Sequence, residues 1–185
     1  MEKQPPSPVG PLETFKTLEA QLFSGKITPK VFLKKIEDLD QDDRSRESSL
    51  RATEVLSHPA VEELLKDSPD RVMFYNLRSL SYFHKAQIRL RQGDMHVEDD
   101  LTKALNDSEE IAQQNVDWSN YIRATIAYLK NDMEEVQRYA VLLTENKSLV
   151  ENFVLGLEER GRPDYFVDYA RERNDEDEVG GVPSD

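Results

Sequence analysis

The chain has no cysteine, and glycine is sparse, with seven residues in 185. The absence of cysteine excludes disulfide bonds, thiolate-ligated zinc, iron–sulfur clusters and thiol catalysis. The glycines form neither a phosphate-binding loop nor a dinucleotide-binding pattern. No apolar run reaches the length of about 18 residues that a membrane-spanning helix needs. Residues 1–10 lack the basic and apolar stretches of a secretory signal, and we expect a soluble, cytoplasmic protein.

Positive charge is also scarce. The chain holds 24 Lys and Arg against 37 Asp and Glu, which gives a formal net charge of -13 at pH 7. Nucleic acids and anionic lipid surfaces would on average be repelled by such a chain. We therefore expect neither a nucleic acid nor a membrane as its partner.

Apolar residues recur at helical spacing along most of the chain, and no run alternates as a strand would. The pattern predicts an all-α fold of about ten helices, arranged as stacked antiparallel helical hairpins. We expect a single domain over residues 11–173, since a chain of this length suits one domain. The flanking segments 1–10 and 174–185 bury little apolar surface and are predicted to be disordered, the second as an acidic tail.

Four of the predicted turns share one pattern. Each has a residue that tolerates a positive φ angle, and a capping residue or a proline follows soon after it. These four residues are Gly25, Gly93, Asn131 and Gly161. Two of the turns, at Gly93 and Asn131, lie about 38 residues apart, a spacing typical of two-helix repeats.

These turns resemble those of the tetratricopeptide family, mainly over residues 75–145. Repeats of that family join two helices through a turn of Gly-Asp type, and Asp94 and Asp132 fall at the position of the turn aspartate. Ala86 and Ala124 then fall at the small position of the first helix. The resemblance implies a superhelix of hairpins. Because the spacings elsewhere depart from a strict repeat of about 34 residues, an irregular helical bundle is the alternative.

The segment from Arg71 to Gly93 contains five cations and no acidic residue. On a helix, four of the cations would share a narrow face with two tyrosines. We call this face the basic stripe, and its residues are Arg71, Tyr75, Arg78, Tyr82, Lys85 and Arg89. Cations interleaved with aromatic rings favour an acidic peptide or a phosphate group as ligand. Residues 94–117 are rich in carboxylates, so pairing of the stripe within the chain is the alternative.

The sequence predicts no metal site and no catalytic residue. The three histidines, His58, His84 and His96, form no helix-spaced pair. The aspartate-rich string 38–43 imitates the start of a calcium loop, but it lacks the glycine and the glutamate that such a loop requires later. We expect a solvated acidic loop that ends a helix there. No nucleophile or cofactor motif occurs, so no cofactor is predicted.

These observations favour a non-catalytic module, adaptor or chaperone-like, that binds a segment of a partner protein. The partner would be acidic if the basic stripe holds it. One alternative is a structural protein whose hairpins pack against copies of themselves as a homo-oligomer. Another is an enzyme of uncharacterised activity. The dependence of molecular mass on concentration separates the first two.

Overall fold

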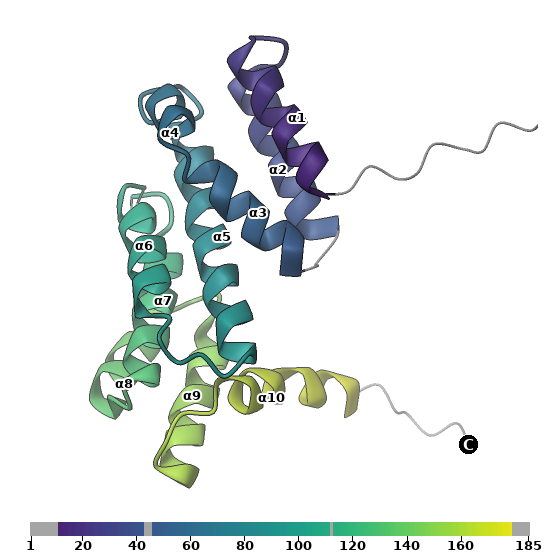
Figure 1. Cartoon of the computed structure of the whole chain (residues 1–185). Helices are drawn as coiled ribbons and strands as arrows, with labels where there is room; N and C mark the ends of the chain where they lie inside the picture. The colour runs from purple at the N-terminus through teal and green to yellow at the C-terminus, as the bar shows by residue number, and fades with distance from the viewer. Residues whose placement is uncertain (1–10, 43–45, 112, 179–185) are drawn as a thin grey trace, which may run out of the picture. The chain divides into compact units, whose positions relative to one another are not determined.

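The computed structural model describes the backbone of residues 11–42, 46–111 and 113–178, and the side chains of residues 14–40, 48–111 and 113–171. The described residues form ten α-helices and no strand, so the predicted all-α fold is confirmed (Figure 1). The contacts of the chain fall into two compact units, residues 1–88 and 89–185. The single domain over residues 11–173 stays a prediction.

The first unit holds α1 (Pro11–Phe23), α2 (Pro29–Asp42), α3 (Arg46–Leu56), α4 (Pro59–Leu65) and most of α5 (Arg71–Arg91). Two of its helices begin with a capping residue followed by a proline. The Thr28 hydroxyl accepts a hydrogen bond from the backbone N–H of Val31 at 3.3 Å, and Pro29 opens α2 with its fixed φ. Pro59 opens α4 in the same way, after His58 as the cap.

The core of the first unit is aromatic and aliphatic. α1, α2 and α3 pack against one another, and α4 packs against α3. Two hydrogen bonds tie α5 to α3 and to the residue that follows it: the Thr53 hydroxyl donates to the carbonyl of Ser81 at 3.0 Å, and the Ser57 hydroxyl donates to the Tyr82 hydroxyl at 2.7 Å. The largest fully buried side chains of this unit are Phe15, Phe32, Leu33, Ile36, Leu56, Val61, Leu65 and Phe74.

The second unit starts at Arg89, near the end of α5, and continues through α6 (Glu98–Glu109), α7 (Val116–Leu129), α8 (Met133–Ala140), α9 (Lys147–Arg160) and α10 (Tyr165–Glu178). From α6 onward each helix packs against the next along the chain, and α7 also packs against α9. Tyr128 and Phe153 stack at its centre, with ring centroids 4.4 Å apart. A helical bundle fits this arrangement, and a tetratricopeptide-like superhelix stays a prediction.

All four predicted turn residues adopt a positive φ: 69° at Gly25, 78° at Gly93, 59° at Asn131 and 64° at Gly161. Glycine has no Cβ to clash there, and among other residues asparagine tolerates this conformation best. The four turns are thus confirmed.

The two turns that carry the family resemblance nevertheless differ. Asp132 caps α8 directly, since its carboxylate accepts from the N–H of Glu135 at 3.1 Å. Asp94 accepts from the N–H of His96 at 2.9 Å, and α6 begins only at Glu98. Asp94 therefore shapes a longer connection instead of capping a helix.

Ser68 followed by Pro69 has the pattern of a helix start, a cap and then a proline, but α5 begins only at Arg71. Ser68 and Pro69 instead form a turn in which the Ser68 hydroxyl accepts from the N–H of Asp70. α10 runs to Glu178, into the segment predicted as a disordered acidic tail, because adding a residue to an established helix costs far less than starting one. The rest of that tail and residues 1–10 lie outside the described residues. Of the helices described, none combines the length and the apolar character needed to cross a bilayer.

Candidate functional site

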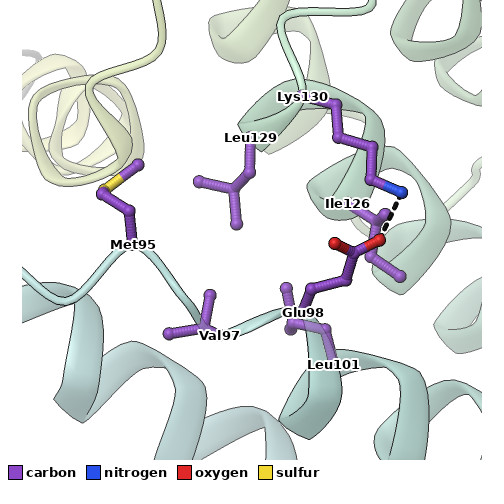
Figure 2. Close-up of a pocket in the computed structure, with 7 residues that line it drawn as sticks. All are labelled: Met95, Val97, Glu98, Leu101, Ile126, Leu129 and Lys130. Carbon is purple, nitrogen blue, oxygen red and sulfur yellow. Dashed lines mark ion pairs between the residues drawn. The ribbon is translucent and has the colours of Figure 1, made fainter.

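A small apolar pocket lies in the second unit, between the start of α6 and the end of α7 (Figure 2). Its volume is about 100 Å³, and it is partly open to solvent. Val97 and Leu101 are almost fully buried, whereas Met95 is 55% exposed. A cavity of about 150 Å³ is known to take a benzene ring, so this pocket has room for one aliphatic side chain. Its lining residues are Met95, Val97, Glu98, Leu101, Ile126, Leu129 and Lys130.

An ion pair stands beside the apolar lining. Lys130 Nζ lies 2.5 Å from Glu98 Oε1, and both side chains are more than half exposed (Figure 2). The pair links the first residue of α6 to the residue that follows α7. An exposed pair of this kind contributes only about 0–1 kcal/mol, so either partner can exchange for an incoming charge at little cost.

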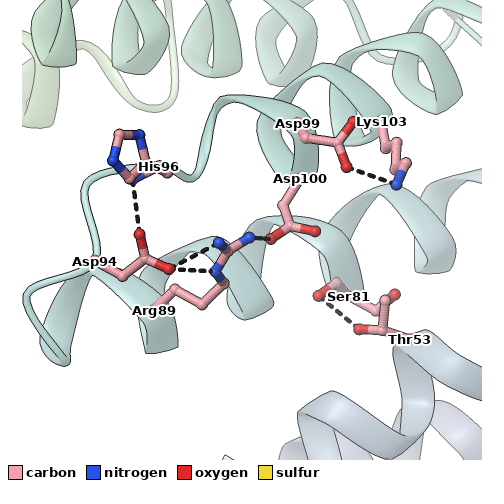
Figure 3. Close-up of polar contacts among 8 residues, drawn as sticks. All are labelled: Thr53, Ser81, Arg89, Asp94, His96, Asp99, Asp100 and Lys103. Atoms are coloured by element: carbon pink, nitrogen blue, oxygen red, sulfur yellow. Dashed lines mark hydrogen bonds and ion pairs between the residues drawn. The ribbon is translucent and has the colours of Figure 1, made fainter.

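Arg89 fixes the segment that forms one wall of the pocket (Figure 3). Its Nε and Nη2 donate to Asp94 Oδ2 at 2.9 and 2.7 Å, and its Nη1 donates to Asp100 Oδ2 at 2.7 Å. Hydrogen bonds to Asp100 and then Asp94 raise the pKa of Arg89 above its ordinary value. The pKa of Asp94 is lowered below its ordinary value by the hydrogen bond from the N–H of His96 and then by that from the Arg89 side chain. One guanidinium thus fastens both ends of the 94–100 segment, which carries Met95 and Val97.

The opposite wall is fixed by the turn after α7. The N–H of Lys130 donates to the carbonyl of Ile126, and the N–H of Asp132 donates to that of Ala127. The positive φ of Asn131 reverses the chain, and its side-chain amide donates to the carbonyl of Gly161 at 3.2 Å. Ile126, Leu129 and Lys130 are therefore held in place by backbone hydrogen bonds.

The surroundings of the pocket are acidic. Lys103 pairs with Asp99 at 2.7 Å, and Arg89 takes up two further carboxylates. The 94–100 and 130–134 segments together hold six carboxylates and one lysine, Lys130. The carboxylates of segments 94–100 and 130–134 belong to Asp94, Glu98, Asp99, Asp100, Asp132 and Glu134.

The residues of the basic stripe in the first unit are engaged with groups of the chain itself. Arg78 is only 8% exposed, and its guanidinium lies over the rings of Phe74 and Tyr75, 4.7 and 5.2 Å from their centroids. Its Nη1 lies 3.2 Å from Glu62 Oε1. Arg71 also lies over Tyr75, at 5.3 Å. Cations held by rings and a carboxylate present less charge to a ligand.

The other stripe residues differ in exposure and partners. Tyr75 is buried, the Tyr82 hydroxyl accepts from Ser57, and Lys85 is half-buried. Arg89 pairs with Asp94 and Asp100 in the segment that follows it, as the internal-pairing alternative predicts. Arg78 pairs with a carboxylate that precedes it. Binding of a partner by the stripe stays a prediction.

Sequence reasoning missed a buried polar centre in the second unit. Asp168 is fully buried, and its carboxylate accepts a hydrogen bond of 2.5 Å from the Tyr128 hydroxyl. It also forms ion pairs with Arg160 and Arg171. Burial raises the pKa of the Tyr128 hydroxyl above its ordinary value, and the hydrogen bond to the Asp168 carboxylate raises it further. The centre joins α7, α9 and α10, and it acts in packing these helices.

The aspartate-rich string 38–43 was predicted to be solvated, and this is wrong at Asp40. Asp40 is 4% exposed, and its carboxylate accepts from the Ser49 hydroxyl at 2.8 Å and lies 3.0 Å from His84 Nδ1. Burial alone would raise the pKa of Asp40, but His84 and Ser49 outweigh it and the pKa is lowered. The carboxylate is buried because α3 and α5 supply both of its partners.

Among the described residues, no group of three or more His, Cys, Asp or Glu side chains could hold a metal ion. His84 pairs with Asp40, and the Nδ1 atom of His58 accepts from the N–H of Ala60 at 3.3 Å. His96 is exposed at the turn after Asp94. The side chain of His58 thus caps α4, and that of His84 holds the buried Asp40.

The pocket itself escaped sequence reasoning, because its walls come from two helices and two turns. One signal was available: Met95 is an apolar residue in a polar turn, and such a residue is exposed unless a neighbour covers it.

Comparisons with protein-family models, with curated proteins and with solved structures find no match to this chain.

Proposed function

We propose that this chain is a non-catalytic interaction module, an adaptor or chaperone-like protein, that binds a segment of a partner protein. The observation that carries the proposal is the apolar pocket beside Met95, which is partly open and large enough for one side chain. Protein interfaces draw much of their energy from a few apolar side chains that insert into such pockets.

The walls of the pocket support this role because they are preorganised. The Arg89 clamp fixes the wall that includes Met95, and the turn at Asn131 fixes the opposite wall. A pocket that is already ordered loses little conformational entropy when a side chain enters it. The exposed Met95 adds an adaptable apolar surface at the mouth, since methionine fits irregular partners well.

The chemistry of the lining favours binding over catalysis. Apart from five apolar side chains, the pocket presents one carboxylate and one ammonium group, Glu98 and Lys130, which pair with each other. Acid–base or nucleophilic catalysis requires groups that converge on a reacting atom, with a base beside the nucleophile. A mutually neutralised, exposed pair provides neither.

The proposal can be tested by capture of partners from a lysate of the source cell, identified by mass spectrometry. Met95→Glu would place a charge at the mouth of the pocket, and we expect it to lose a partner that the wild type retains. Met95→Leu keeps the mouth apolar and should retain the partner. Val141→Glu, at the other end of α8 and 77% exposed in the wild type, introduces the same charge away from the pocket.

Circular dichroism and thermal unfolding establish that all variants fold alike. Equal capture of every partner by Met95→Glu and Met95→Leu would contradict the proposal. Capture of the chain alone, with a molecular mass that rises with concentration, would favour the self-assembling alternative.

A further inference from the structure

The pocket and the charge around it together specify the chemistry of the segment that binds there. We infer that the pocket takes one aliphatic side chain from a basic segment of the partner protein, and that a lysine or arginine beside that side chain pairs with Glu98. This inference rests on the proposed function and adds the sequence type of the ligand.

The size of the pocket selects the inserted side chain. Its volume of about 100 Å³ is smaller than the cavity of about 150 Å³ that takes a benzene ring. Val, Ile, Leu or Met therefore fits the pocket more readily than an aromatic side chain does. The lining carries no buried polar group that could satisfy a polar insert, since Val97, Leu101, Ile126 and Leu129 are all aliphatic.

The rim of the pocket selects the charge of the residues next to the insert. The 94–100 and 130–134 segments hold six carboxylates and one lysine, and the side chains of Asp99 and Glu98 are 75% and 64% exposed. The chain as a whole carries a charge of -13. An acidic segment would be repelled on approach, while a basic one is attracted.

Glu98 is the carboxylate placed to receive the cation. It lines the pocket itself, so a residue next to the inserted side chain lies within its reach (Figure 2). Its present partner, Lys130, is 55% exposed and tethered by a flexible chain. An incoming cation can share the carboxylate with Lys130 or replace it, because the exposed pair contributes so little.

A selection from random peptides tests the inference. The full chain, and in parallel the Met95→Glu variant, would be screened against a display library of random twelve-residue peptides. Peptides enriched by the wild type and lost with Met95→Glu depend on the pocket. We expect these to share an aliphatic residue with lysine or arginine one or two positions away.

A consensus peptide, synthesised and measured by fluorescence anisotropy, then tests the individual contacts. Met95→Glu should weaken its binding by about tenfold or more, because losing the apolar contact and desolvating a carboxylate at the mouth of the pocket outweigh the added attraction for the basic residue. Glu98→Gln should weaken it by about two- to fivefold, as expected for one exposed ion pair. Asp99→Asn removes the same charge from the next residue, which does not line the pocket, and should have a smaller effect.

Replacing the basic residue of the peptide with glutamine should abolish the effect of Glu98→Gln, because the two groups would no longer interact. Enrichment of acidic or uncharged peptides that still depend on Met95 would overturn the inference and leave the proposed function standing. So would equal effects of Glu98→Gln and Asp99→Asn. If no peptide depends on Met95, both the inference and the proposed function fail.

Discussion

Gly156 lies directly against the carboxylate of Asp168. A Cβ atom added to Gly156 would fall 2.0 Å from Asp168 Oδ2 and 2.2 Å from its Cγ, far inside contact distance. The carboxylate cannot move away easily, because Tyr128 and Arg160 hold the same oxygen. Glycine in α9 is therefore a requirement of the way α10 packs on that helix.

Gly156→Ala should destabilise the protein strongly, although alanine favours a helix by about 1 kcal/mol over glycine. The added methyl group would displace a buried carboxylate from its partners, and we expect a net loss of about 2–4 kcal/mol in the free energy of unfolding. Urea titration followed by circular dichroism measures this. Glu158→Ala, an exposed position on the same helix, should stay within about 0.5 kcal/mol of the wild type. An unchanged or stabilised Gly156→Ala would show that α10 does not pack as described.

Tyr128→Phe tests the same buried polar centre by removing the hydroxyl that contacts Asp168. The hydroxyl donates to Asp168 and accepts from the N–H of Asp164, the residue before α10. Its removal takes one hydrogen bond from the buried Asp168 carboxylate and one from the N–H of Asp164, so we expect a loss of about 1–3 kcal/mol in the free energy of unfolding. Tyr139→Phe is the matched control, because the Tyr139 hydroxyl accepts from the exposed Arg138. Equal effects of the two changes would contradict a special role for Tyr128.

Sequence alone predicted those parts of the fold that depend on local chemistry. A positive φ needs glycine or asparagine, and a helix start needs a cap or a proline, so the turns at Gly25, Gly93, Asn131 and Gly161 could be found from single residues. The fold class followed from the helical spacing of apolar residues. These features require no knowledge of which helices meet.

The polar centres could not be predicted, since each joins residues that are distant in sequence. Asp168 meets Tyr128 across 40 positions, and Asp40 meets His84 across 44. In a chain with 37 acidic residues, nothing local distinguishes these two from solvated ones. Gly156, inside an otherwise helical pattern, was the one local sign of a close approach. The basic stripe was similarly a local pattern whose partners, such as Glu62 for Arg78, depend on packing.

Asp117 makes the stability of the fold depend on pH in the acidic range. Its carboxylate accepts from the N–H of Thr144 at 3.1 Å and from that of Glu145 at 2.7 Å, which holds the loop before α9 against the start of α7. Burial alone would raise the pKa of Asp117, but these N–H groups outweigh it and lower the pKa below 3.8. A lowered pKa contributes stability above the ordinary value, and that contribution is lost as pH falls through the folded value.

Asp117→Asn should therefore lower the free energy of unfolding by about 1 kcal/mol at pH 7, as the loss of a charged cap does. The difference from the wild type should shrink as pH falls below about 4, where the wild-type carboxylate also becomes neutral. Urea titrations at several pH values from 7 down to about 3 check this against Glu158→Gln, an exposed carboxylate of the same unit. A difference that is constant over this range would contradict the role of the charge.

Arg89 contributes to the stability of the second unit and also holds one wall of the pocket in place. Arg89→Met removes the guanidinium that pairs with Asp94 and with Asp100, whose side chain is 1% exposed. We expect a loss of about 1–3 kcal/mol in the free energy of unfolding, less than for a fully buried pair because the arginine side chain is 32% exposed. Adding Asp100→Asn should recover part of this loss, since an uncharged amide costs less to leave buried.

The same change should act locally on the pocket. Amide hydrogen exchange at residues 94–97 should become faster in Arg89→Met under native conditions, while exchange in α9 stays close to that of the wild type. Affinity for a pocket-dependent peptide should fall with it, because the wall that includes Met95 and Val97 would no longer be preorganised. Lys103→Met removes another cation of this region, from an exposed pair with Asp99, and should leave both the exchange and the affinity nearly unchanged. Equal effects of the two substitutions would mean that net charge, and not the clamp, controls the pocket.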